Sequence, residues 1–136
     1  GRKVLDLFAG SGQLGIEALS RGASLAVFVD QNPRAIEVIK DNLNVCKLEK
    51  NSRVLQTTAA SFLSGIGEQF DIVFIDPPYN SNIILDIMPL VLKRMSEHGI
   101  IITEYSLDEE MPDSFEDFVK QKDYKYGKIG VSVYRR

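Results

Sequence analysis

VLDLFAGSGQLG, residues 4–15, is the stretch that decides the fold, because a short apolar run leads directly into Gly10, Gly12 and Gly15. Gly-x-Gly-x-x-Gly after a strand is the fingerprint of loops that bind dinucleotides. Such glycines permit a tight turn and let the backbone approach a ligand, and the helix expected after Ser11 offers free N–H groups. The stretch therefore predicts a strand, a ligand-binding loop and a helix.

Outward from this loop, apolar runs and helical patterns alternate along the chain. Continuous β-branched runs indicate strands buried on both faces of a sheet. The further apolar runs lie at residues 25–29, 54–55, 72–75 and 100–102. Helical patterns run from Ile16 to Arg21, from Asn32-Pro33 to Leu43, from Ile83 to Met95 with a kink or break expected at Pro89, and around residues 115–119. This alternation predicts a mostly parallel sheet with helices on both faces.

The end of the chain has a different pattern. Tyr124 to Gly130 and Val131 to Arg136 predict two strands joined by a tight turn, which would add an antiparallel hairpin to the sheet. The predicted fold class is therefore α/β and Rossmann-like, with residues 1–136 forming one domain. Ligands of such sheets bind at the carboxyl ends of the strands, so we expect the chemistry just after each strand.

Composition restricts the classes of function. The 136 residues carry a net charge of −3 and one cysteine, Cys46, so neither an internal disulfide nor a thiolate metal cluster can form. We therefore expect a protein of the reducing cytoplasm that binds no metal ion. We also expect it to be a monomer and not to associate with a membrane. No apolar run approaches the roughly 20 residues that span a bilayer. Because Gly1-Arg2-Lys3 leads straight into a strand, we also expect that a further segment precedes residue 1.

Asp6 separates two classes of ligand for the glycine loop. This carboxylate lies four residues before Gly10 on the first strand, where it would repel a pyrophosphate. S-adenosylmethionine has no phosphate and carries an α-ammonium that Asp6 and the carbonyls near Ala9 and Gly10 can accept. Asp6 therefore favours S-adenosylmethionine over NAD, although the glycine spacing alone would allow either ligand or a simple turn.

Two further strand ends are candidates for contacts with the nucleoside part of the cofactor. Asp30 ends the second strand and could accept both ribose hydroxyls, or alternatively cap the helix that begins at Pro33. Thr58 and Ala59 follow the third strand, where an adenine edge would lie, although Thr58 could also be a turn residue. The residues expected to contact the cofactor are Asp6, Phe8, Ala9, Gly10, Gly12, Asp30, Gln31, Thr58, Ala59 and Asp76.

FDIVFIDPPY, residues 70–79, predicts the reacting end of the site. A buried strand ends in Asp76-Pro77-Pro78-Tyr79, and the two prolines stiffen the turn. The Asp76 carboxylate and the Pro77 carbonyl are two acceptors at a fixed spacing, which suits an exocyclic NH2 group, and Tyr79 can stack on the base that carries it. We therefore expect Asp76, Pro77, Pro78 and Tyr79 to be the catalytic residues, acting by positioning and electrostatics.

These motifs also resemble those of a known family. Asp76–Tyr79 resembles motif IV of amino-directed methyltransferases, and Asp6–Gly12 resembles their motif I. The string Val4–Ala23 closely resembles the RsmD family of bacterial 16S rRNA guanine-N2 methyltransferases, as do Ala60–Leu63 and Val133–Arg135. The resemblance covers essentially the whole chain. It implies a seven-stranded methyltransferase sheet, S-adenosylmethionine as cofactor, and rRNA or the small ribosomal subunit as partner. It also implies that the segment expected before residue 1 binds substrate.

Other functions remain compatible with the motifs. Asp-Pro-Pro-Tyr does not separate guanine from adenine, so an amino-methyltransferase for adenine in DNA or for another RNA is an alternative. The glycine spacing with Asp30 leaves an NAD-dependent oxidoreductase, and a non-catalytic binding module is a third class. Lysines and arginines are frequent from Lys120 to Arg136 and could contact phosphates, but Asp117 and Asp123 among them favour a solvated face.

Overall fold

The computed structural model describes residues 1–65, 67–78 and 81–136, and within them the strands form one eight-stranded sheet. The elements are, in chain order, β1 (Lys3–Leu7), α1 (Gln13–Ser20), β2 (Leu25–Asp30), α2 (Pro33–Cys46), the 3-10 helix η1 (Glu49–Asn51), β3 (Ser52–Gln56), α3 (Ala59–Leu63), β4 (Phe70–Ile75), α4 (Ser81–Leu92), β5 (Met95–Ser106), β6 (Ser114–Phe115), β7 (Phe118–Tyr126) and β8 (Ile129–Arg135).

The strand order is β3-β2-β1-β4-β5-β8-β7-β6. Strands β1 to β5 pair in parallel, whereas β5 with β8, β8 with β7, and β7 with β6 pair antiparallel. The order reverses between β1 and β4, so the carboxyl ends of these two strands flank a crevice of the kind that binds ligands in open α/β sheets. The predicted mixed sheet with a C-terminal hairpin is confirmed.

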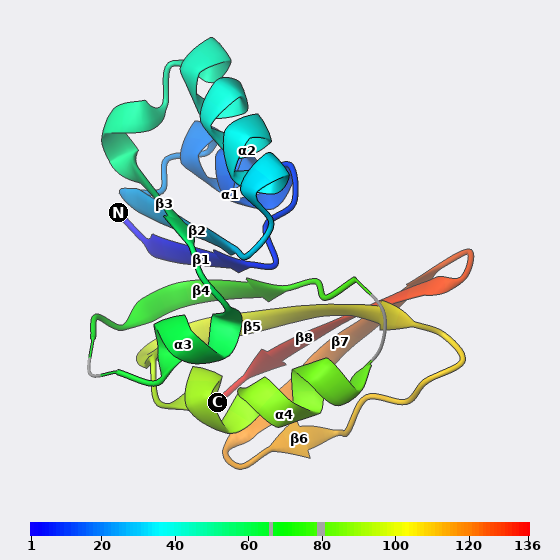
Figure 1. The fold of residues 1–136 in the computed structure, drawn as a ribbon. Coiled ribbons are helices and arrows are strands. Elements are labelled where there is room, and N and C mark those ends of the chain that lie inside the picture. The colour runs from blue at the N-terminus through cyan, green and yellow to red at the C-terminus, as the bar shows by residue number, and fades with distance from the viewer. Residues whose placement is uncertain (66, 79–80) are drawn as a thin grey trace.

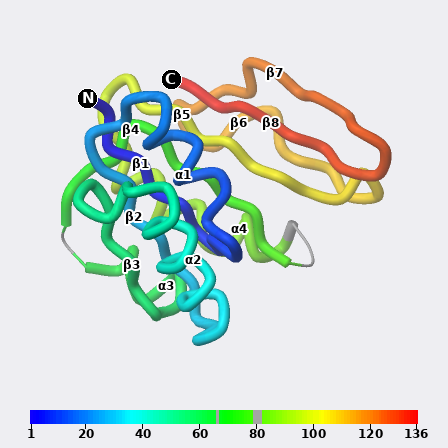
Figure 2. The backbone as a smooth tube through the Cα atoms, turned by 90° about the horizontal axis from the view of Figure 1, so that it is seen from above, coloured from blue at the N-terminus to red at the C-terminus, as the bar shows by residue number. Residues whose placement is uncertain are grey.

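Helices cover both faces of the sheet (Figure 1). Helices α1 and α2 pack on one face through a cluster centred on Phe28 and Ile39. Helices α3 and α4 pack on the other face through a larger cluster that contains Leu5, Val73 and Met88. Viewed from above, the β7–β8 hairpin extends to one side of the body that these layers form (Figure 2). No helix in the described ranges is both long and apolar enough to cross a membrane.

Local signals in the sequence account for several helix boundaries. The helix start predicted at Asn32-Pro33 is confirmed, because the Asn32 side chain accepts the Arg34 N–H at 2.9 Å as the cap of α2 and Pro33 occupies the first helical position. Helix α4 continues past Pro89 to Leu92 instead of splitting there. Strand β5 already begins at Met95, so the prediction of a helix up to Met95 was too long at its end.

The C-terminal third corrects three predictions. The sheet has eight strands instead of seven, because the two-residue strand β6 extends its edge. A helix around residues 115–119 was wrong. Phe115 and Phe118 face each other across a tight turn between β6 and β7, and the Phe115 ring lies 4.9 Å from that of Tyr134. The hairpin turn lies at Gly127, where φ is +58°, and Gly130 is inside β8.

Candidate active site

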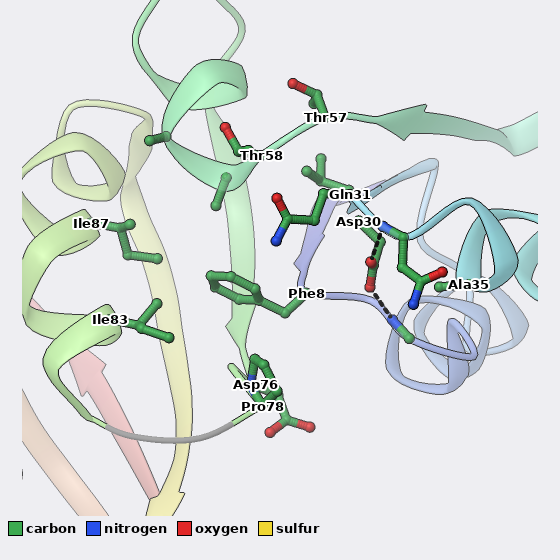
Figure 3. Close-up of a pocket in the computed structure, with 15 residues that line it drawn as sticks. Phe8, Asp30, Gln31, Ala35, Thr57, Thr58, Asp76, Pro78, Ile83 and Ile87 are labelled. Atoms are coloured by element: carbon green, nitrogen blue, oxygen red, sulfur yellow. Dashed lines mark hydrogen bonds between the residues drawn. The ribbon is translucent and has the colours of Figure 1, made fainter.

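A cavity of about 580 Å³ opens at the carboxyl ends of β1, β2, β3 and β4 (Figure 3). Eight of the sequence-predicted site residues line it: Phe8, Gly10, Asp30, Gln31, Thr58, Ala59, Asp76 and Pro78. These residues come from distant parts of the chain and meet because the parallel strands end at the same edge of the sheet. The opposite wall is apolar and consists of Ile83 and Ile87 from α4, which sequence reasoning did not single out.

Two smaller cavities adjoin this one, and Asp76 lines all three. One, of about 360 Å³, contains Asp6 and Ala9 beside Asp76. The other, of about 290 Å³, contains Pro77 and Pro78. Tyr79 lies outside the described residues. Gly12 lines none of the three cavities. Instead, Gly12 faces Ile39 and Phe28. It is the N-cap residue of α1 and has a φ of +79°.

The Asp30 carboxylate joins two loops. One of its oxygens accepts the Gly10 N–H at 3.0 Å, and the other accepts the Asn32 N–H at 2.9 Å. Both bonds run to backbone groups, as Figure 3 shows with dashed lines. A carboxylate offers about four lone-pair sites, so each oxygen can still accept a hydroxyl. Asp30 can therefore hold the backbone just before α2 and bind a ligand at the same time.

Thr58 has a structural role in the absence of a ligand. Its hydroxyl accepts the Ser61 N–H at 3.1 Å and caps the short helix α3. Thr58 nevertheless lines the large cavity, together with Ala59. The hydroxyl thus serves as a helix cap instead of the turn residue that the sequence also allowed, while a contact of this segment with an adenine edge stays a prediction.

Asp6 is a buried carboxyl group, with 1% of its surface exposed. It accepts the Gly15 N–H at 3.0 Å, which ties β1 to the first turn of α1. Burial raises the pKa of Asp6 to about 7, the Gly15 bond lowers it in part, and the nearby charges of Asp76 and Asp30 raise it further. A carboxyl group with a raised pKa is stabilised in its charged form by a cation, and it disfavours an anion.

Asp76, directly after β4, and Glu104, inside the neighbouring strand β5, form a carboxyl pair. Ile75 pairs with Thr103, so the next residue on each strand is one of these two. Burial raises the pKa of Asp76 to about 7, and the hydrogen bond and charge of Glu104 add to this rise. Sequence analysis did not include Glu104 among the site residues. The signal that points to it in the sequence is its place in the strand next to Asp-Pro-Pro in a parallel sheet.

Phe8 carries the strain of the loop. Its φ of +59° lies in the left-handed region, where a bulky side chain is uncommon, and its ring projects into the large cavity (Figure 3). The Ala9 N–H donates to the Val29 carbonyl at 3.1 Å and the Gly12 N–H donates to the Ala9 carbonyl at 2.8 Å, so the surrounding bonds hold this conformation. Strain of this kind is concentrated at functional sites.

Comparison with known proteins shows which family this chain belongs to. A family model described as "Conserved hypothetical protein 95" matches residues 1–135. The Bacillus subtilis protein named "Putative rRNA methyltransferase YlbH" is 36% identical, with 100% of this chain and 77% of that protein covered. The Escherichia coli protein named "Ribosomal RNA small subunit methyltransferase D" is 30% identical, with 98% and 68% covered. The chain belongs to the family that this model describes. The resemblance to the RsmD family that the motifs indicated is therefore confirmed.

A solved structure supports the fold of this RsmD-family chain. A Streptococcus pyogenes protein described as a conserved hypothetical protein superimposes with a TM-score of 0.94, at 36% identity and with 100% of this chain and 86% of that chain covered. The Rossmann-like methyltransferase fold predicted from the motifs is confirmed, apart from the strand count. In the described part of the chain, no three His, Cys, Asp or Glu side chains are grouped so that they could hold a metal ion.

Proposed function

We propose that this RsmD-family chain is an S-adenosylmethionine-dependent methyltransferase that modifies the N2 amine of a guanine in small-subunit (16S) rRNA, with residues 1–136 as its catalytic domain. The observation that carries the proposal is the position of Asp76, where the large cavity meets the smaller cavity beside Pro77 and Pro78. A methyl donor in the first cavity and a base in the second would have their reacting atoms next to this carboxylate.

The chemistry of the large cavity and its acidic neighbour fits the cofactor. Asp6, Asp76 and Glu104 make one side acidic, which suits the ammonium and sulfonium groups of S-adenosylmethionine. Asp30 retains acceptor capacity for the two ribose hydroxyls. The aromatic ring of Phe8 and the apolar side chains of Ile83 and Ile87 provide a surface for the adenine ring. NAD fits less well, because its pyrophosphate would approach the acidic groups.

The amine is positioned by the loop after β4. In the proposal, the Asp76 carboxylate and the Pro77 carbonyl each accept one N–H of the exocyclic amine, so that the nitrogen lone pair is directed at the methyl group. We propose that Tyr79 stacks on the base. Holding the reacting atoms in line supplies much of the rate enhancement in a reaction of this type.

Methyl transfer balances without a metal or a covalent intermediate. S-adenosylmethionine supplies an electrophilic methyl group on a sulfonium sulfur. The N–C bond forms as the C–S bond breaks, the bonding electrons remain on sulfur as a thioether, and the product nitrogen loses one proton. In the proposal, this proton passes to Asp76 and Glu104, whose carboxyl groups are close to one another, and from them to solvent.

The substrate class comes from the relatives. The E. coli relative is named a ribosomal RNA small subunit methyltransferase, and N2 of guanine is what the motif resemblance implies. The test is transfer of labelled methyl groups to small ribosomal subunits, naked 16S rRNA and DNA, followed by nucleoside analysis of the product. We expect N2-methylguanosine in 16S rRNA. Label only in DNA would refute the RNA substrate, and labelled adenine would refute the guanine.

The cofactor is tested separately by calorimetric titration with S-adenosylhomocysteine and, in parallel, with NAD. We expect binding of S-adenosylhomocysteine alone, because Asp6 disfavours a pyrophosphate at the glycine loop. Binding of NAD alone would overturn the methyltransferase proposal.

A further inference from the structure

An exposed aromatic surface shares its sheet face with the site. Residues that pair across neighbouring strands point to the same face of a sheet. Two such rows run from β5 across β8 to β7, namely Glu104–Val131–Tyr124 and Ser106–Ile129–Tyr126. Neighbouring strands lie about 4.8 Å apart, so Tyr124 is two strand spacings, about 10 Å, from Glu104. A nucleotide next to a base bound in the cavity of about 290 Å³ beside Pro77 would therefore extend toward the two tyrosines.

Tyr124 and Tyr126 are unusually accessible for large side chains. They are 40% and 65% exposed, and their rings stack with centroids 6.3 Å apart at an interplanar angle of 20°. Ile129, opposite Tyr126, is 44% exposed. Exposed aromatic rings on a sheet face are the structural basis on which several RNA-binding domains stack bases.

Lysines flank the tyrosines without carboxylate partners. Lys122 lies two residues before Tyr124 on the same strand, and Lys128 lines the cavity of about 290 Å³ together with Asp76. Throughout the described ranges, neither lysine is within ion-pair distance of a carboxylate. Both cations are therefore available to phosphate groups.

The two acidic residues that suggested a solvated face are engaged elsewhere. Asp123 accepts the hydroxyls of Tyr105 and Ser132 at 2.7 and 2.9 Å. Asp117 pairs with Arg136 at 2.8 Å. Neither carboxylate forms an ion pair with Lys122 or Lys128, so neither one withdraws these two cations from a phosphate.

We propose that the hairpin face binds the single-stranded RNA segment that adjoins the nucleotide in the cavity of about 290 Å³. The hairpin face is the surface formed by Lys122, Tyr124, Tyr126, Lys128 and Ile129. Tyr124 and Tyr126 stack on its bases, and Lys122 and Lys128 contact its phosphates. RNA fits better than a protein partner because exposed rings and unpaired cations lie beside a cavity of a size suited to one base. This inference rests on the proposed function, since it names the surface that holds the substrate of the same site.

The test compares variants of the full chain by fluorescence anisotropy with a labelled single-stranded RNA of mixed sequence. We expect Tyr124→Ala and Tyr126→Ala to weaken binding about tenfold each. The double variant Lys122→Gln/Lys128→Gln should reduce the steepness of the salt dependence by about 1.4 log units per log unit of salt, because two phosphate contacts are lost.

The matched control is Lys125→Gln. Lys125 lies on the same strand but alternates to the opposite face, where it pairs with Gly130, so we expect less than a twofold change.

Three outcomes would overturn the inference. They are normal binding by the tyrosine variants, an effect of Lys125→Gln as large as that of Lys122→Gln/Lys128→Gln, and no RNA binding by the parent chain at low salt. Titration with S-adenosylhomocysteine separates this inference from the proposed function. Hairpin variants should keep the parent affinity, because the hairpin face does not line the large cavity. A parent chain that bound RNA through the hairpin face but not S-adenosylhomocysteine would refute the proposed function alone.

Discussion

The Gly10 N–H donates to the Asp30 carboxylate at 3.0 Å, a contact that links the glycine loop to the end of β2 across 20 positions of the chain. The second oxygen of Asp30 holds the Asn32 N–H. One side chain thus fixes the shape of two loops that line the large cavity, while its remaining lone pairs are available for further hydrogen bonds.

Asp30→Ala should therefore reduce the affinity for S-adenosylhomocysteine by tenfold or more. The variant loses the proposed ribose acceptor and also leaves two backbone N–H groups without their partner, each worth about 1 kcal/mol. Calorimetry measures the affinity, and thermal unfolding measures the cost to the fold. Asp41→Ala, on the exposed surface of α2, is the matched control. An unchanged affinity would show that Asp30 has only the structural role.

Asp76→Ala should reduce methyl transfer at least a hundredfold while the affinity for S-adenosylhomocysteine changes little. The reason is that Asp76 is proposed to position the amine in the transition state, and removal of one such group costs about 3 kcal/mol or more. Single-turnover transfer and calorimetry measure the two quantities. Asp86→Asn, an exposed carboxylate on α4, is the control. Parallel losses of transfer and binding would instead assign Asp76 to the cofactor or the fold.

The transfer rate should rise with pH through about 7. Asp76 has a raised pKa of about 7 and must be ionised to accept the amine N–H, so protonation below that pH should slow the reaction. Glu104→Gln removes a neighbouring negative charge and should shift the midpoint to lower pH. A pH profile of single-turnover rates in parent and variant tests this. The same midpoint in both would show that Glu104 does not act on Asp76.

Asp6→Asn should change how stability depends on pH. The folded-state pKa of Asp6, about 7, is higher than its ordinary value of 3.8. The folded protein therefore binds a proton that the unfolded chain has released, and the free energy of unfolding falls as pH rises between these values. From pH 5 to 8 the parent should lose about 2–3 kcal/mol through this group, a loss that the neutral Asn avoids.

Urea unfolding of parent and Asp6→Asn at both pH values measures this difference. Asn retains an oxygen that can accept the Gly15 N–H, so the variant should keep the fold. Its affinity for S-adenosylhomocysteine should nevertheless fall, because the ammonium loses a charged partner. Identical pH dependence in the two proteins would show that Asp6 is ionised in the folded state at pH 5.

Gly15→Ala should destabilise the protein by about 1–3 kcal/mol, because a Cβ at this position would clash with Cε2 of Phe28. Helix α1 would have to move away from β2, and the Gly15 N–H would move away from Asp6. Chemical denaturation measures the loss. The double variant Gly15→Ala/Phe28→Leu should recover part of it by making room. A stable single variant would indicate that the Phe28 ring can shift at little cost.

Local and periodic signals in the sequence determined most of the framework. The glycine loop, the Asn32-Pro33 helix start and the apolar runs predicted the strand–helix alternation, because each depends on residues close together in the chain. The rule that parallel strands present ligands at their carboxyl ends then placed Asp30 and Asp76 at one site. The roles of the site residues in binding and catalysis stay predictions.

Tertiary structure alone decided which distant groups meet. Glu104 comes next to Asp76 only because β5 pairs with β4 in that register, and Asp6 is buried only because α1 packs over β1. The spacing of Phe115 and Phe118 suits a helix as well as a tight turn. The turn forms because it lets Phe115 pack against Tyr134 of β8. Pairing register, burial and the pKa changes that follow depend on contacts between residues far apart in the chain, which local propensity does not encode.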